Sequence, residues 1–143
     1  PPRSTLFPYT TLFRSPTTGF MVDNKAPKSA INNIKVLTLF GLDRIRDRWG
    51  PLRITSGYRS PALNTMAGGV ADSAHIYGCA ADIVPLDPNV TVEMIWNWLP
   101  ESGLQYDQAI WEISRKGNHW LHYGITRPGH KGPRLMHFKK DMR

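Results

Sequence analysis

Residues 56–82 read SGYRSPALNTMAGGVADSAHIYGCAAD and hold a dense group of chemically useful side chains. The stretch begins and ends in two short β-prone runs, residues 52–56 and 80–84, and its middle is a loop containing Gly, Ser and Asn. Pro61 favours a helical turn near the start of this loop. A loop of about twenty residues is uncommon in a compact domain unless it has a function. The stretch therefore predicts two strands joined by a long functional loop.

Two helices are predicted on either side of this loop. An amphipathic helix of about residues 28–48 ends before Gly50-Pro51, and Thr91 can cap a second helix that runs to about Leu99. The apolar positions of the first helix recur at steps of three and four residues: Ile31, Ile34, Thr38, Leu42, Ile45 and Trp49.

The C-terminal third of the chain predicts a β-hairpin. Residues 108–114 and 119–125 are strand-like and are joined by a short polar turn. The tail, residues 131–143, is basic, and Leu135, Met136 and Phe138 are typical of an edge strand. We therefore expect one α+β domain, with flanking helices packed on a mostly antiparallel sheet.

Composition limits the classes of partner and of metal site. The 18 Lys and Arg exceed the 11 Asp and Glu by seven, which favours polyanionic partners such as nucleic acid or an anionic cell wall. The basic residues are scattered without an aromatic and basic repeat, so we do not expect nucleic-acid binding. Cys79 is the only cysteine, so a metal site must use His and carboxylate ligands. His130 and His137 have no partner at ligand spacing, and we expect them to be solvated.

The N-terminal residues 1–15 have a different origin from the rest. Residues 5–15, TLFPYTTLFRS, resemble one translated reading frame of a widely used sequencing adapter. We expect residues 1–15 to be an artefact fused to a truncated gene and residues 16–143 to form the domain. No apolar run approaches the roughly 20 residues of a membrane helix, so no membrane insertion is expected.

Three motifs, in their order, resemble the zinc D-Ala-D-Ala carboxypeptidase family of peptidoglycan peptidases. The family pattern is an SGYRS-like strand end, then S-x-H with an Asp seven residues after the His, then a late W-x-H. The chain has SGYRS at 56–60, SAH at 73–75, Asp82, and WLH at 120–122. The resemblance covers about residues 16–138 and implies a hedgehog/D-Ala-D-Ala peptidase-like fold.

The resemblance implies a Zn²⁺ site formed by His75, Asp82 and His122. Catalytic zinc sites commonly use three protein ligands and leave a fourth position to water. His75 lies in the loop and Asp82 on the strand that follows, so the chain can fold back and aim both at one ion. His122 alternates with Trp120 and Gly124 on one strand face, which the family pattern makes the metal side.

The same resemblance implies roles for four further residues. Glu112 in QAIWE occupies the place of a Glu found in many short phage members, whereas His119 stands three residues before the last ligand, where some members have Glu or His. We favour Glu112 as the general base and His119 as a stabiliser of the transition state. Arg59 is expected to bind a peptide carboxylate with its planar guanidinium. Ser73 contacts substrate in the family, and its other interpretation is a cap of its own loop.

Together these features predict metal-assisted hydrolysis of a peptide bond in the peptidoglycan stem. Removal of a terminal D-alanine and cleavage of the L-Ala-D-Glu bond both remain open. The compact length, the QYDQAIWE segment and the basic tail look most like phage or prophage members. We therefore expect a monomer that acts on the bacterial cell wall, in the periplasm or as a phage lysin or virion protein. The alternative is a non-catalytic cell-wall-binding or virion module with a structural zinc.

Overall fold

The structure, a computed structural model, describes residues 12–14 and 21–143. Most of the segment 1–15 therefore lies outside the described residues. Its described part is β1 (Leu12–Arg14), which pairs antiparallel with β2 (Met21–Asp23) in a two-stranded sheet. The assignment of residues 1–15 to an artefact stays a prediction.

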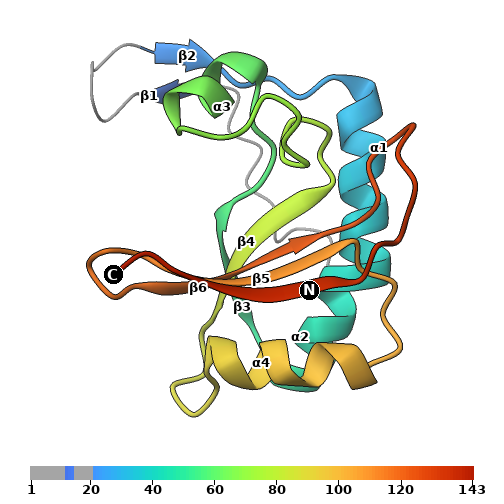
Figure 1. The fold of residues 1–143 in the computed structure, drawn as a ribbon. Helices are drawn as coiled ribbons and strands as arrows, with labels where there is room; N and C mark the ends of the chain where they lie inside the picture. Colours follow the sequence, from blue (N-terminus) through green and yellow to red (C-terminus); the bar gives the residue numbers. More distant parts are fainter. Residues whose placement is uncertain (1–11, 15–20) are drawn as a thin grey trace.

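A five-stranded sheet with the strand order β3-β4-β6-β5-β7 forms the centre of the molecule (Figure 1). Neighbouring strands are antiparallel except β5 and β7, which are parallel. The mostly antiparallel α+β architecture, the hairpin and the C-terminal edge strand are confirmed, whereas the hedgehog-like fold stays a prediction. The strands are β3 (Leu52–Ser56), β4 (Ala80–Pro85), β5 (Gln108–Ile113), β6 (His119–Gly124) and β7 (Met136–Asp141).

The first predicted helix is a single rod that contains a π-helical segment in its middle. It consists of α1 (Lys28–Leu37), η2 (Thr38–Leu42) and α2 (Asp43–Trp49). The second predicted helix is α4 (Val92–Trp98), whose cap Thr91 accepts a hydrogen bond from the Met94 amide, and η3 (Leu99–Glu101) continues it. The short α3 (Pro61–Met66) lies on the opposite side of the sheet from α4 (Figure 1). Within the described ranges, no helix combines the length and the apolar character needed to cross a membrane.

The apolar core lies between one face of the sheet and two helical segments, the long rod (α1, η2 and α2) and α4 with η3. Successive side chains of a strand point to opposite faces, so every second residue of β4, β5 and β6 joins this core. Gly41 in η2 packs against the ring of Tyr123, where an added Cβ would lie 2.5 Å from a ring carbon. The intervening strand residues face the other side, which is where the polar side chains gather. The core residues from these strands are Ala81, Ile83, Ala109, Trp111, Ile113, Leu121 and Tyr123.

A β-bulge in β3 redirects the start of the SGYRS motif. The register between β3 and β4 shifts after Ile54, so that Ser56 lies opposite Asp82 and Thr55 is the additional residue. Ile54 packs against the core, and the extra residue turns Ser56 to the face that carries Asp82. The Ser56 hydroxyl then accepts a hydrogen bond from Arg59 Nε at 3.0 Å.

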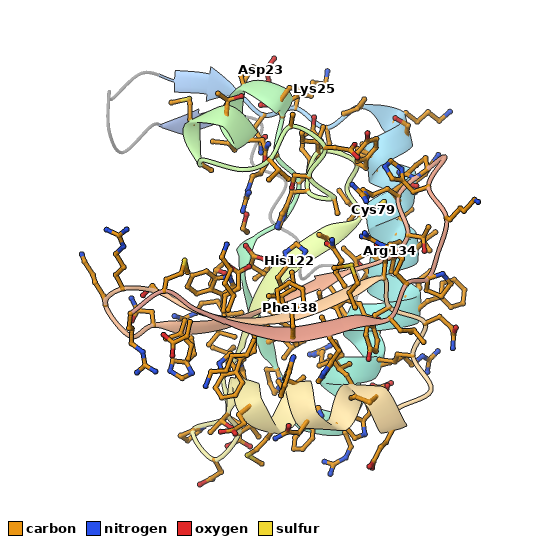
Figure 2. All side chains as sticks on the ribbon, viewed as in Figure 1. Asp23, Lys25, Cys79, His122, Arg134 and Phe138 are labelled. Atoms are coloured by element: carbon orange, nitrogen blue, oxygen red, sulfur yellow. The ribbon has the colours of Figure 1, made fainter. Side chains whose placement is uncertain are left out.

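An ion pair between buried Asp107 and partly exposed Arg134 holds the connection between β6 and β7 against the start of β5. The buried carboxylate of Asp107 accepts hydrogen bonds from Arg134 Nη2 at 2.6 Å and from the Arg134 backbone at 3.0 Å (Figure 2 labels Arg134). The Asp107 amide donates to Gly124 O, and the Asp107 carbonyl accepts from the Met136 amide. The connection thus passes the start of β5 and returns as β7, parallel to β5.

Asp107→Asn is expected to destabilise the protein by about 2 kcal/mol at pH 7. The substitution removes the charge of a buried carboxylate, and its partner Arg134 is partly exposed. Burial favours the neutral acid, but Arg134 outweighs it and holds the pKa of Asp107 below its usual range. The stabilisation is therefore complete above the unfolded pKa of about 4 and is lost as the pH falls through the lower folded pKa.

Urea unfolding of wild type and of Asp107→Asn from pH 7 to pH 2.5 measures the difference in their free energies of unfolding. This difference should shrink below about pH 4. Asp141→Asn is the matched control, since Asp141 forms an exposed pair with Arg143. A difference between wild type and Asp107→Asn that stays constant with pH would contradict the assignment.

Candidate metal centre and active site

His75, Asp82 and His122 meet on the polar face of the sheet. Asp82 on β4 and His122 on β6 are direct cross-strand partners, and the loop before β4 brings in His75. His75 Nε2 lies 3.3 Å and His122 Nδ1 lies 3.0 Å from Asp82 Oδ1. Two ligands about 2.0–2.1 Å from a tetrahedral zinc ion lie about 3.3–3.4 Å apart, so these separations suit a shared ion. All three residues are buried, and Figure 2 labels His122 on the sheet, on the side away from α4.

The hydrogen bonds of the two rings leave the inward nitrogens free to coordinate a metal. His75 Nδ1 lies 2.8 Å from the Gly57 carbonyl, which can only accept, so Nδ1 carries a proton. His122 Nε2 lies 3.0 Å from Gln108 Oε1, which also accepts. With a cation bound between these residues, each ring would keep the proton on its outer nitrogen and would offer the lone pair of His75 Nε2 or His122 Nδ1 to the ion. Three electron-pair donors facing one another fit a bound cation.

The SGYRS motif holds the loop that carries His75. Besides the bond from the His75 ring to Gly57 O, the Arg59 amide donates to the His75 carbonyl at 3.1 Å. Ser60 caps α3 by accepting from the Leu63 amide. The two sequence motifs, SGYRS and SAH, are therefore parts of one rigid unit.

Asp82 is the electrostatic centre of the group. Burial would raise the pKa of its carboxyl, but the hydrogen bonds and charges of His122 and His75 outweigh burial and hold the pKa well below its usual range. Arg59 Nη2 also lies 3.4 Å from Asp82 Oδ2, while Arg59 Nη1 lies 3.4 Å from Asn64 Oδ1. Asp82 is thus ionised at neutral pH, as a metal ligand requires.

Glu112 lies on the same face as the metal group, one strand beyond His122. In the register of β5 and β6, Ile110 is opposite His122 and Glu112 is opposite Trp120. Burial, followed by the negative charge of Asp82, raises the pKa of the Glu112 carboxyl. A half-buried carboxylate with a raised pKa beside a metal group has the properties of a general base.

Comparison with known proteins agrees with the motifs. The family model described as Peptidase M15, the zinc D-Ala-D-Ala carboxypeptidase-like family, matches residues 14–111, more than half of the chain. The chain belongs to the M15 peptidase family. No curated protein matches it. The matched region includes His75 and Asp82 but ends before His122, so the place of His122 in the candidate metal group rests on the motif and on its position in the structure.

The structure does not bring His119 to the candidate metal group. His119 precedes His122 by three residues on β6, and odd spacings on a strand place side chains on opposite faces. Its Nδ1 accepts a hydrogen bond from Trp111 Nε1 at 3.1 Å on the face that carries the core. We therefore assign no catalytic role to His119. Ser73 lies in the metal loop, where its hydroxyl accepts from the His75 amide at 3.3 Å as a loop cap does.

A cluster around Asp72 joins the metal loop to the connection after β6. The Asp72 carboxylate accepts hydrogen bonds from Tyr77 Oη at 2.6 Å and from Arg127 Nη1 at 2.8 Å, and His130 Nε2 lies 2.8 Å from it. His130 is exposed, as expected, but it also contacts Asp72, a partner that the sequence spacing did not predict. Because Arg127 and His130 are more than fifty positions from Asp72 in sequence, spacing alone gave no sign of this contact.

Sequence reasoning also missed Gln108, Asn24 and the environment of His137. Gln108 and Glu112 are four residues apart on β5 and therefore lie on the same face of the strand. This spacing was visible in the sequence. Asn24 Oδ1 accepts from the Ser60 amide at 2.6 Å and so anchors the SGYRS motif from outside it. His137 is not solvated: its ring stacks on Trp96 with centroids 3.9 Å apart.

Proposed function

We propose that this M15 peptidase is a zinc enzyme that hydrolyses a peptide bond in the peptidoglycan stem. The observation that carries the proposal is the convergence of three potential ligand atoms, from His75, Asp82 and His122, with Glu112 on the same face of the sheet. Membership of the M15 family supports a peptidase, and the donor set supports zinc. A site with three protein ligands leaves one position for water or substrate.

Zinc, when bound, lowers the pKa of its water towards about 7 and polarises the scissile carbonyl. Glu112 takes a proton from the attacking water and delivers it to the leaving nitrogen, so the C–N bond breaks with an amine as leaving group. Its raised pKa makes the protonated form accessible for the second transfer. His75 and Asp82 keep their positions through the SGYRS backbone and Arg59.

Arg59 is proposed to bind a carboxylate of the stem peptide. Three of the five N–H donors of its guanidinium make the contacts to Ser56, Asn64 and Asp82, which fix its plane beside the metal group. The remaining donors can bind an anion. Ser73 is the second proposed substrate contact, because its hydroxyl hydrogen is not used in accepting from His75. Both stem bonds, the terminal D-Ala bond and the L-Ala-D-Glu bond, place a carboxylate near the scissile carbonyl. We propose that the protein acts at the bacterial cell wall.

Incubation of the zinc-loaded full chain with purified peptidoglycan tests this function. Released fragments are identified by mass spectrometry, with a chelator and with zinc restored after chelation. We expect release that the chelator abolishes and zinc restores, and no release by His75→Ala, which lacks one ligand. The mass of the fragment identifies the bond.

A folded, zinc-binding chain that sediments with cell walls but releases no fragment would overturn the peptidase and support the cell-wall-binding module. If synthetic stem peptides are also left uncleaved, poor access to the bonds of intact peptidoglycan cannot explain the lack of release. The decisive quantity is the fragment release by wild type compared with that by His75→Ala.

A further inference from the structure

Gln108, at the start of β5, lies on the same face of the sheet as the metal group. The register pairs Gln108 with Gly124 and Ile110 with His122, so Gln108 and His122 are diagonal neighbours across the two strands. Gly124, directly opposite Gln108, has no side chain to occupy the space between them. Gln108 Oε1 accordingly reaches to 3.0 Å from His122 Nε2.

In the orientation that the Gln108 amide has here, this contact favours the proton on Nε2 of His122. The amide oxygen can only accept, so the contact places a proton on Nε2, and the ring that binds a metal would then use the lone pair on Nδ1. His122 Nδ1 lies 3.0 Å from Asp82 Oδ1, where the other tautomer would donate its proton to Asp82 and close the coordination position. Gln108, with its amide oxygen turned to the ring as it is here, opposes that tautomer, because it would place the Nε2 lone pair against this oxygen.

The proton positions of the two histidine rings are set by different kinds of acceptor. A backbone carbonyl, Gly57 O, fixes the proton of His75, and no substitution removes it. A side chain fixes the proton of His122. Resting on the proposed zinc function, we propose that Gln108 is a positioning residue that holds His122 with its proton on Nε2 and so presents Nδ1 to the metal.

Zinc affinity of the full chain, measured by competition with a chromogenic chelator, tests this role. Gln108→Leu removes the acceptor and is expected to raise the zinc Kd about 10–100-fold, as loss of a partner of a metal-bound histidine does. Gln108→Glu keeps an acceptor oxygen and is expected to restore most of the affinity. Gln105→Leu is the matched control, because the Gln105 side chain is exposed and donates to the nearby Gly103 carbonyl, away from the metal group.

A second readout reports the proton itself. In ¹⁵N spectra of the zinc-loaded protein, the His122 Nε2–H signal should be sharp in wild type and Gln108→Glu and broadened by exchange with water in Gln108→Leu. Zinc binding by Gln108→Leu as tight as wild type, with a sharp Nε2–H signal, would overturn the role of Gln108 alone. Equal losses in Gln108→Leu and Gln108→Glu would assign Gln108 a merely structural role. Wild type that takes up no zinc would overturn the proposed function and this inference with it.

Discussion

Replacement of Glu112 by Gln is expected to lower kcat by about 10²–10⁴-fold, the range that a positioned general base contributes. The substitution keeps the size of the side chain and removes its ability to accept a proton from water. Zinc affinity should change little, because Glu112 is not one of the three ligand residues. Hydrolysis of a stem peptide and chelator competition, measured on the same samples, separate these two quantities.

The pH dependence of activity tests the role of Glu112 as general base independently. A base works in its ionised form, so activity should rise with pH through the pKa of Glu112, which burial and Asp82 raise above the usual value of a glutamate. Glu112→Gln should lose this acidic limb. Glu93→Gln on α4 is the matched control, because Glu93 is exposed on a helix that packs on the other face of the sheet. Full activity of Glu112→Gln together with loss of activity in His119→Ala would transfer the role of base to His119.

Alternation along strands made much of the site predictable. The period of two placed His122 with Trp120 and Gly124, and the structure has this face towards Asp82. The helices were predictable for a similar reason, since the steps of three and four residues mark the buried side of the rod. The π-helical segment was not predictable from that pattern. It lies where Gly41 approaches the Tyr123 ring, a contact between residues that are remote in sequence.

The same alternation argues against a catalytic His119, and the sequence already contained this argument. A residue three positions before a ligand shares its face in a helix but not in a strand. The resemblance to the family suggested the role, and the strand geometry separates His119 from the metal group. The spacing of residues in the sequence does not predict the contacts between loops. The bonds of Asn24 to Ser60 and of Arg127 to Asp72 depend on how the connections fold over the sheet.

Asp82→Asn is expected to abolish detectable hydrolysis and to raise the zinc Kd by more than the roughly 10–100-fold attributed to partners of metal ligands. The amide keeps the shape of the side chain but loses the negative charge that faces two histidines and Arg59. Without this charge, the Arg59 guanidinium and a zinc ion would lie close together with no anion between them, and their repulsion opposes binding.

Zinc competition and peptide hydrolysis measure the two effects of Asp82→Asn, and thermal unfolding in chelator shows whether the metal-free fold persists. Asp82→Glu keeps the charge on a longer side chain and provides a second variant if Asp82→Asn does not fold. Asp141→Asn is the matched control, because Asp141 is exposed at the end of β7 and pairs with Arg143. Zinc binding by folded Asp82→Asn at wild-type affinity would mean that the metal is held elsewhere. Asp82 Oδ1 lies within 3.3 Å of both histidine nitrogens, so this substitution changes the one residue that contacts the other two members of the group.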